Sequence, residues 1–231
     1  MKTVVVPPLL CSPLAYLPVL DTLWSRGQVT FADTRRDSTI TGMAKRVLRE
    51  NEGDFALLGT SMGGYVALEI MRQAPGRVTA LALVSTTARA DSAEQRESRA
   101  RQSALVEAGQ FAALINAAYT GVVAAANETN ETLLTTWRSM TTPVGAEAFL
   151  QQQDAVANRA DLRSVLPTIS CPMAIIHGTA DRLIPITAAM ETATAVPNAL
   201  YTAIEGAGHL LFHEQPTAAR AAINEWLDTA S

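Results

Sequence analysis

Three kinds of side chain in this sequence could together carry out nucleophilic chemistry. Ser61 stands inside the stretch GTSMG, residues 59–63, and the chain contains three histidines, His177, His209 and His213. A serine hydroxyl is a weak nucleophile at neutral pH unless a neighbouring base accepts its proton. The imidazole of histidine suits that task because its ordinary pKa is about 6.5. A serine that meets one of these histidines would attack an electrophilic carbonyl carbon.

The sequence around Ser61 predicts a sharp turn from a strand into a helix. The apolar run FALLG, residues 55–59, is typical of a buried strand, and a helical pattern extends from Met62 to Gln73. In that context the G-x-S-x-G pattern predicts an exposed nucleophile, because glycines on both sides of the serine avoid a collision in the turn. The helix start directs free N–H groups there, so the Met62 amide is expected to stabilise an oxyanion. The alternative is a glycine-rich turn with an idle serine.

Among the histidines, His209 is the predicted base. It lies between two glycines in a loop after the last predicted strand, and such a loop can reach across the strand ends to the serine. His177 stands at the end of a predicted strand, where packing or a hydrogen bond is the simplest role. His213 is expected to hold the start of the last helix, with Glu214 as a partner.

Asp181 is the predicted carboxylate partner of the histidine. It follows the strand pattern MAIIHG, residues 173–178, and it gives the chain order serine, aspartate, histidine. A carboxylate in this position fixes the tautomer of the imidazole and stabilises its cation. The alternative roles are a helix cap or an ion pair with the neighbouring Arg182. All three candidate residues fall at strand ends on the same side of one sheet, which favours the catalytic interpretation.

The elements that must position these residues alternate between strands and helices. Such alternation predicts parallel strands joined by right-handed crossovers, with helices on both faces of the sheet. Strand patterns occupy residues 3–6, 28–33, 55–59, 78–86, 173–178 and 199–205. Helical patterns occupy residues 16–26, 40–51, 62–73, 186–196 and 216–230.

One long region contains helical patterns and no strand pattern. These helical patterns cover residues 92–108, 111–119, 131–140 and 146–159. A helical insertion between two strands of a sheet predicts a cap that lies over the strand ends. The expected organisation is therefore a core of residues 1–86 and 169–231, with a cap of residues 87–168 inserted between strands.

Composition excludes several classes of function. Hydrophobic residues make up 48% of the 231 residues and charged residues 17%, as in a globular protein with a sizeable core. The net charge of −4 and the scattered basic residues argue against nucleic-acid binding. No apolar run reaches the roughly 18 residues that span a bilayer. Prolines interrupt the only stretch that resembles a secretory signal, so we expect a cytoplasmic protein.

The sequence predicts neither a metal nor an organic cofactor. It contains no metal-ligand spacing and no G-x-G-x-x-G pattern. The two cysteines, Cys11 and Cys171, are too few for a disulfide framework and are expected to be small buried side chains in a reducing compartment. The sequence leaves the oligomeric state open.

Three segments together resemble the α/β-hydrolase fold family. GTSMGG, residues 59–64, is similar to the nucleophile elbow of that family, HGTADRLIP, residues 177–185, to its acid loop, and GAGHLLFHEQP, residues 206–216, to its histidine loop. The resemblance extends over nearly the whole chain and implies a compact serine hydrolase with six parallel strands. It also implies that the helical cap is the lid of the family.

The loop after the first strand departs from the family pattern. Many members carry His-Gly there, and the next residue donates an N–H to the oxyanion, whereas this chain has Pro7 and Pro8. By position Leu9 would supply the second N–H, with Leu10 as the fallback. Proline has no N–H but fixes φ, so Pro8 could hold the turn without donating. The entrance loop, residues 32–39, also lacks the glycines of the family.

The predicted activity is hydrolysis of a small carboxylic ester or lactone through an acyl-enzyme. Ser61 attacks, His209 transfers the proton, Asp181 orients His209, and water releases the acyl group. The same residues could hydrolyse carbon–carbon bonds or support cofactor-free perhydrolysis. The alternative from a different class is a non-catalytic receptor that kept the binding pocket.

Candidate substrate contacts come from the cap and from the loop after the first strand. Apolar side chains there could line a pocket, although core packing is the favoured interpretation of their helical spacing; they are Leu10, Phe111, Trp137, Met140 and Phe149. Four arginines could anchor a substrate carboxylate or pair with Asp37 and Asp161; they are Arg35, Arg36, Arg159 and Arg163.

Overall fold

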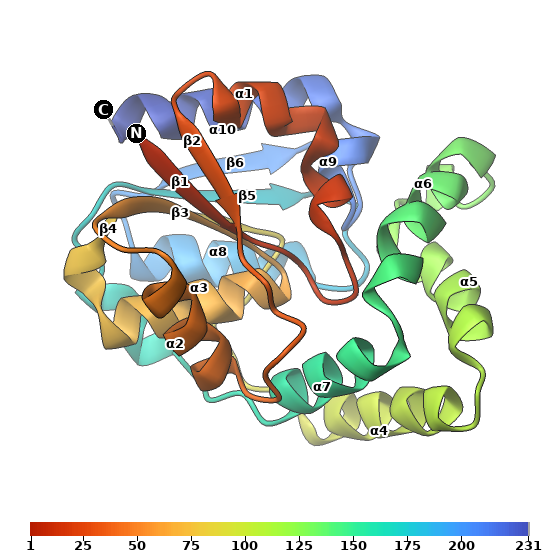
Figure 1. Cartoon of the computed structure of the whole chain (residues 1–231). Coiled ribbons are helices and arrows are strands. Elements are labelled where there is room, and N and C mark those ends of the chain that lie inside the picture. Colours follow the sequence, from red (N-terminus) through yellow and green to blue (C-terminus); the bar gives the residue numbers. More distant parts are fainter. Residues whose placement is uncertain (231) are drawn as a thin grey trace.

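A computed structural model describes residues 1–230 and confirms a six-stranded parallel sheet. The strand order is β2-β1-β3-β4-β5-β6, and every neighbouring pair is parallel (Figure 1). The strands are β1 Lys2–Val6, β2 Gln28–Phe31, β3 Phe55–Thr60, β4 Val78–Val84, β5 Met173–Gly178 and β6 Leu200–Ile204.

Helices cover both faces of this sheet (Figure 1). One face carries α1 (Leu20–Trp24) and α10 (Pro216–Thr229), and the other carries α2 (Ile40–Glu50), α3 (Met62–Gln73) and α8 (Ile186–Ala195). Alternate strand residues therefore enter two different cores: Val5 packs on the α1 and α10 side, whereas Val4 packs on the α2 and α3 side. Burial of both strand faces explains why the strands read as continuous apolar runs.

The first helical segment differs from the expectation. The sequence predicted one helix over residues 16–26, but the chain forms a 3-10 helix, η1 (Pro13–Val19), followed by the short α1. Pro18 cannot donate a backbone N–H, and its ring crowds the preceding turn, so a regular α-helix is interrupted there. Gly27, with a φ of 129°, ends the segment where it was predicted to end.

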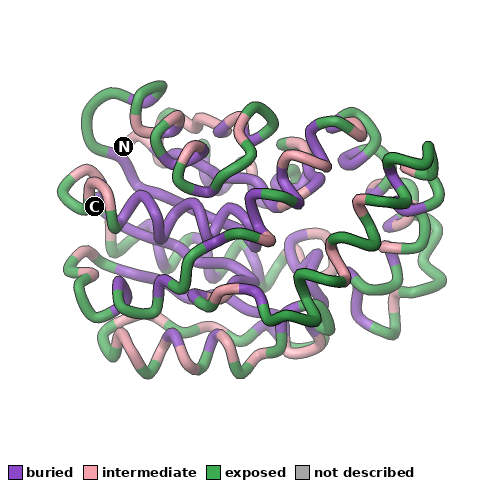
Figure 2. The backbone as a smooth tube through the Cα atoms, turned by 90° about the horizontal axis from the view of Figure 1, so that it is seen from below, coloured by how far each residue is buried: buried purple, intermediate pink, exposed green. Residues whose placement is uncertain are grey.

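Four helices lie between β4 and β5, in the region predicted to form the cap. They arch over one end of the sheet in Figure 1, and Figure 2 shows that this region is far more exposed than the sheet. The division into core and cap domains at residues 87 and 168 stays a prediction. The four helices are α4 Ala93–Glu107, α5 Phe111–Val122, α6 Glu131–Thr141 and α7 Ala146–Ala157.

Short helices complete the chain. The four-residue α9 (Leu211–Glu214) precedes α10, and four further 3-10 helices connect longer elements. These are η2 Pro75–Arg77, η3 Ala125–Asn127, η4 Thr142–Val144 and η5 Arg163–Thr168. Within residues 1–230, no helix combines the length and the apolar character needed to cross a lipid bilayer.

The strand order determines where a site can form. The chain passes from β1 outward to β2 and then returns to the other side of β1 for β3, so the loops after β1 and β3 diverge. Crevices at such a switch point, outside the carboxyl ends of the strands, are the usual ligand sites of parallel sheets. Tyr16 connects the carboxyl ends of β1 and β3, since its hydroxyl lies 3.0 Å from Val6 O and 2.8 Å from Thr60 Oγ1.

Candidate active site

Ser61 occupies the turn between β3 and α3 in a conformation that L-residues rarely adopt. Its φ is 52° and its ψ is −115°. Two contacts, from the last residue of β4 and from the segment after it, hold Ser61: its N–H donates to Val84 O at 2.9 Å, and Thr86 Oγ1 donates to its carbonyl oxygen at 2.8 Å. Strained backbone of this kind persists only where the surroundings fix it, and it is common at functional sites.

The glycines around Ser61 are required by close backbone approaches. A Cβ on Gly63 would collide with the carbonyl oxygen of Val6, at the end of β1. A Cβ on Gly59 would collide with the carbonyl oxygen of Gly63, and one on Gly64 with the side chain of Thr86. A side chain at either glycine of the G-x-S-x-G pattern, Gly59 or Gly63, would therefore collide with the backbone, as the sequence pattern implied.

Asp181 and His209 form a direct pair at the ends of β5 and β6. The Nδ1 of His209 lies 2.7 Å from Oδ2 of Asp181, and both side chains are buried. The other carboxylate oxygen accepts the N–H groups of Leu183 and Ile184, each at 2.9 Å. Because Nδ1–H is donated to the carboxylate, a neutral imidazole keeps Nε2 as its proton acceptor.

The carboxylate of Asp181 stays charged. Burial raises its pKa, but the neighbouring His209 and the hydrogen bonds that the carboxylate accepts outweigh burial, so the pKa lies below its ordinary value. The alternative partner, Arg182, turns away and bonds to Glu128 at 2.7 Å and to the backbone of the cap.

The two other histidines have structural contacts. His177 is buried, and its Nε2 lies 2.9 Å from Ile184 O and 3.6 Å from the carboxylate of Asp181. Burial lowers its pKa. This agrees with the expected hydrogen bond at a strand end.

The expected pairing of His213 with Glu214 is wrong. His213 Nε2 lies 3.1 Å from Leu14 O. The carboxylate of Glu214 is already occupied, since it accepts the N–H of Gly208 at 2.9 Å on one oxygen. Its other oxygen accepts the N–H of Ala124 and Nδ2 of Asn127, at 2.7 and 2.8 Å. Glu214 thereby joins the loop of His209 to the cap.

The loop after β1 contains a second unusual backbone. Leu10 has a φ of 63°, and its N–H donates to Oε1 of Gln152, on α7, at 2.8 Å. Nε2 of the same glutamine donates to Thr34 Oγ1, after β2, at 3.1 Å. The N–H of Leu9 has no acceptor among residues 1–230. The first N–H of α3, that of Met62, has no acceptor within its own helix either.

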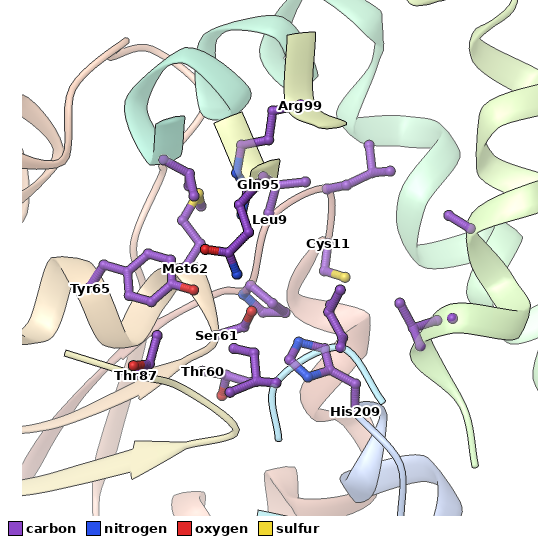
Figure 3. A pocket seen from close by; sticks show the side chains of 18 of the residues that line it. Leu9, Cys11, Thr60, Ser61, Met62, Tyr65, Thr87, Gln95, Arg99 and His209 are labelled. Atoms are coloured by element: carbon purple, nitrogen blue, oxygen red, sulfur yellow. The ribbon is translucent and has the colours of Figure 1, made fainter. Parts of the chain in front are cut away.

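A cavity of about 1150 Å³ lies between the strand ends and the cap. Ser61, Met62, Leu9 and His209 all line it (Figure 3). Of the predicted apolar contacts, Leu10, Trp137 and Phe149 also line it. The two remaining predicted contacts, Phe111 and Met140, are absent from the described cavity wall.

Those two residues pack elsewhere. Met140 is completely buried in the core that contains the cap helices, and Phe111 stacks at a tilt on the ring of Phe149, 6.1 Å between centroids. The surroundings of Phe111 and Met140 therefore agree with the favoured interpretation, in which they are core side chains.

Cys11 also lines the cavity and could compete as a nucleophile. Burial raises the pKa of its thiol to about 12. A thiol is a far weaker nucleophile than a thiolate, so Cys11 is not activated in this setting. Cys11 and Cys171 are both free, and Cys171 is only half-buried.

The candidate arginines have different surroundings. Arg35 and Arg36 pair with Asp33 at 2.8 and 3.0 Å, so the expected pairing with Asp37 is wrong. Asp37 binds Arg46 instead. Arg163 pairs with Asp161, as expected, at 2.7 Å. Arg159 alone among the four lines the cavity within the part of the chain that the structure describes.

Several residues of the cavity wall and its supports were missed by sequence reasoning. A signal was available for two of them, Gln153, which lines the cavity, and Gln152, which supports the loop of Leu10, because both share the buried face of α7 with Phe149 and Val156. Polar residues at core spacing indicate a buried contact. The other missed residues that we use below are Tyr65, Asp91 and Arg99.

The described residues offer no metal centre. Among residues 1–230, no group of three or more histidine, cysteine, aspartate or glutamate side chains lies close enough to hold a metal ion.

Comparisons with known proteins assign the family. Residues 14–223 match the Alpha/beta hydrolase family. A Mycobacterium tuberculosis protein, provisionally named non-heme bromoperoxidase BpoC, is 28% identical over 171 residues. That match covers 72% of this chain, and the chain spans only 65% of that relative's length. Pimeloyl-[acyl-carrier protein] methyl ester esterase from Aromatoleum aromaticum is 25% identical over 198 residues, 78% of this chain and 77% of that protein.

A solved structure has the same fold. It is a thermophilic esterase from Thermogutta terrifontis with malate bound, and the two structures agree with a TM-score of 0.89 at 24% identity. The match covers 100% of this chain and 90% of the esterase. With the strand order, the strained serine turn and the family match in agreement, the chain belongs to the alpha/beta hydrolase family.

Proposed function

We propose that this protein is a serine hydrolase that cleaves a small carboxylic ester or lactone through an acyl-enzyme on Ser61. The observation that carries the proposal is the 2.7 Å contact between His209 and the carboxylate of Asp181. His209 lines the same cavity as the strained serine (Figure 3). A base oriented by a buried carboxylate beside a nucleophile is the arrangement that acyl transfer requires.

The proposed reaction has two halves. The Ser61 Oγ attacks the carbonyl carbon while His209 Nε2 takes the hydroxyl proton, and the N–H groups of Met62 and Leu9 bind the oxyanion. Collapse of the tetrahedral intermediate breaks the bond to the alcohol oxygen, which receives the proton from His209. Water then attacks the acyl-enzyme in the same way, and the acid is released.

Leu9 is the better candidate for the second oxyanion donor. The N–H of Leu10 is bonded to Gln152 at 2.8 Å and is not free for a substrate. The Leu9 N–H has no acceptor within the described residues. This difference supports the assignment of Leu9.

Perhydrolysis is the second candidate function. Hydrogen peroxide would replace water in the second half of the reaction, and the acyl-enzyme would be released as a peracid. The likeness to a protein provisionally named as a bromoperoxidase favours this candidate. Supplying peroxide and assaying peracid formation separates it from hydrolysis.

One experiment tests the nucleophile. The wild type is expected to react with a fluorophosphonate probe and to hydrolyse short 4-nitrophenyl esters. Ser61→Ala should lose the label and roughly 10⁴- to 10⁶-fold of the rate. Ser139→Ala is the control, because Ser139 is exposed on α6 and bonds only to Thr135 O.

A rate loss of only a few-fold in Ser61→Ala would contradict the proposal. Labelling of the wild type without turnover of any ester, lactone or diketone would instead favour a ligand-binding receptor.

A further inference from the structure

The cap side of the cavity holds a charged cluster with one more positive charge than negative. The carboxylate of Asp91, whose side chain is fully buried, accepts from Nε of Arg99 at 2.5 Å on one oxygen and from Nη1 of Arg159 on the other. Two guanidinium groups thus share a single carboxylate, and all three residues line the cavity. An uncompensated charge in a buried place is costly unless a counter-ion can reach it.

Each of the two guanidinium groups keeps an unused donor. Arg159 uses Nε for Arg89 O at 2.8 Å and Nη1 for Asp91 and for Val156 O. Its Nη2 has no acceptor within residues 1–230, although only 3% of the side chain is exposed. Arg99 uses Nε for Asp91 and Nη1 for Gln153, so its Nη2 is also unpaired in the described chain.

Tyr65 connects this cluster to the nucleophile. It follows Ser61 by four residues on α3, about 6 Å along the helix axis. The guanidinium carbon of Arg159 lies 4.2 Å from the centroid of its ring. The phenol hydroxyl has no hydrogen-bond partner among the residues described, and Figure 3 shows it directed into the cavity. Burial raises its pKa, so it stays a neutral donor.

The other ions on the cavity wall already have partners. Arg89 pairs with Glu191 at 2.5 Å, and Arg163, which does not line the cavity, pairs with Asp161 at 2.7 Å and with Glu191 at 3.6 Å. This exposed network contains two cations and two anions. It therefore offers no excess charge, in contrast to the buried cluster.

We propose that Arg99 and Arg159, held in place by Asp91, form a carboxylate-binding subsite to which Tyr65 adds a hydroxyl donor. The preferred substrate is then an ester or lactone that carries a second, free carboxylate, such as a half-ester of a dicarboxylic acid. This inference rests on the proposed ester or lactone hydrolysis. Arg99 and Ser61 line the same cavity, and Figure 3 shows Arg99 on the other side of Gln95 and Leu9 from the serine.

Two substrates of equal length test the subsite. The 4-nitrophenyl half-ester of glutaric acid and 4-nitrophenyl pentanoate differ only by a carboxylate in place of a methyl group. The wild type should have the higher kcat/KM for the half-ester. Arg99→Gln should lower kcat/KM for the half-ester roughly ten- to a hundred-fold, mainly through KM, since a charge-assisted hydrogen bond is lost. The pentanoate should change less than about two-fold.

Matched variants separate charge from folding. Arg99→Lys keeps the charge but loses the planar fork, so an intermediate loss is expected. Arg101→Gln is the control: it removes a cation from the same helix, but Arg101 pairs with Glu97 at 2.8 Å and lies outside the cavity. Its substrate ratio should equal that of the wild type. Arg159 is left intact because its side chain is almost completely buried and also donates to the carbonyl oxygens of Arg89 and Val156, so its loss would disturb the surrounding backbone.

A binding measurement separates this inference from the proposed function. Glutarate should bind to Ser61→Ala in calorimetry, and the additional change Arg99→Gln should weaken binding at least ten-fold. Two results would overturn the subsite: an equal loss of kcat/KM for both esters in Arg99→Gln, or an affinity for glutarate that Arg99→Gln does not change. If pentanoate is hydrolysed without any preference for the half-ester, the subsite fails and the hydrolase stands. If neither ester is hydrolysed but glutarate binds through Arg99, the hydrolase fails and the subsite stands.

Discussion

At the scale of single residues, one carboxylate stabilises two structures at once. Asp181 orients His209 with one oxygen and holds the backbone of its own loop with the other. The sequence offered a histidine partner, a helix cap and an ion pair with Arg182 as alternatives for this residue. One oxygen contacts His209, and the other accepts two N–H groups within its own loop, before α8 begins at Ile186. A substitution at Asp181 would therefore disturb both the imidazole and the loop.

The buried His177 should make stability depend on pH. Burial holds its pKa below the ordinary value, so the unfolded chain binds the proton more readily than the folded protein. The stability that comes from the neutral form is fully present above about pH 6.5 and is lost as the pH falls through the folded pKa. His177→Gln should flatten this dependence, measured by urea unfolding between pH 5 and pH 8. Parallel curves for variant and wild type would contradict the expectation.

Contacts could be predicted where a motif determines them and not where packing does. The turn of Ser61 and the contact between Asp181 and His209 follow from the three motifs, whereas the catalytic roles of these residues stay predictions. Glu214 could not be assigned, because its three donors come from Gly208 and from a cap segment about ninety residues away in sequence.

At the scale of elements, helix α7 supports the loops that follow two strands. Gln152 is buried and bonds to Leu10 after β1 and to Thr34 after β2. Leu10 is held in a left-handed conformation that costs energy for a residue with a side chain. The glutamine therefore supports the backbone that carries the proposed oxyanion donor Leu9.

Gln152→Leu should lower kcat with little change in KM. The Leu10 N–H would lose its acceptor and the loop would shift, and loss of one oxyanion donor costs roughly 10²- to 10³-fold in rate, which sets the upper limit. Thr34→Val is the matched control, since it removes only the second contact and should keep most of the activity. The measurement is steady-state hydrolysis of a neutral ester. An unchanged kcat in Gln152→Leu would show that the loop after β1 keeps its conformation without the glutamine.

Element types were predictable because strands and helices have different patterns. Short continuous apolar runs identified the strands, the 3.6-residue period identified the long helices, and α3 begins and ends where it was expected. The 3-10 helix η1 was missed because a short segment with Pro18 satisfies a helical pattern without forming an α-helix.

At the scale of the whole molecule, hydrogen bonds join the cap to the loops that carry Asp181 and His209. Arg182, next to Asp181, bonds to the backbone oxygens of Thr120 and Val123. Glu214 bonds to the cap at Ala124 and to Gly208 in the loop of His209. Opening of the cap would therefore move the residues proposed to do the chemistry.

Glu214→Gln should loosen this attachment. The amide keeps one acceptor oxygen where the carboxylate has two, so we expect the free energy of unfolding to fall by about 1–3 kcal/mol. Hydrogen exchange should become faster in residues 122–127 and 206–210. Glu97→Gln is the control, because that exposed ion pair on α4 should contribute less than about 1 kcal/mol. Equal exchange in both variants would argue against the attachment.

The arrangement of the whole molecule was predictable only in outline. Alternating patterns gave the sheet, and their interruption gave the helical insertion. The lining of the cavity depends on how cap helices rotate against the core, which determines that Trp137 faces the cavity while Met140, three residues later on α6, is completely buried. The hydrophobic periodicity within one helix does not determine how that helix is rotated against the core.

The bridge made by Gln152 also restricts how the cavity of this protein can be redesigned. Exchanging the entire helical insertion for that of another family member would remove the glutamine and leave the Leu10 N–H without its acceptor. Helix α4 has Val106 as its one buried residue in the described structure, and its Arg99 binds the buried Asp91. A chimera that replaces α4 and α5 but retains α7 and Arg99 would therefore vary the cavity wall while the loop of Leu10 and the carboxylate of Asp91 keep their partners.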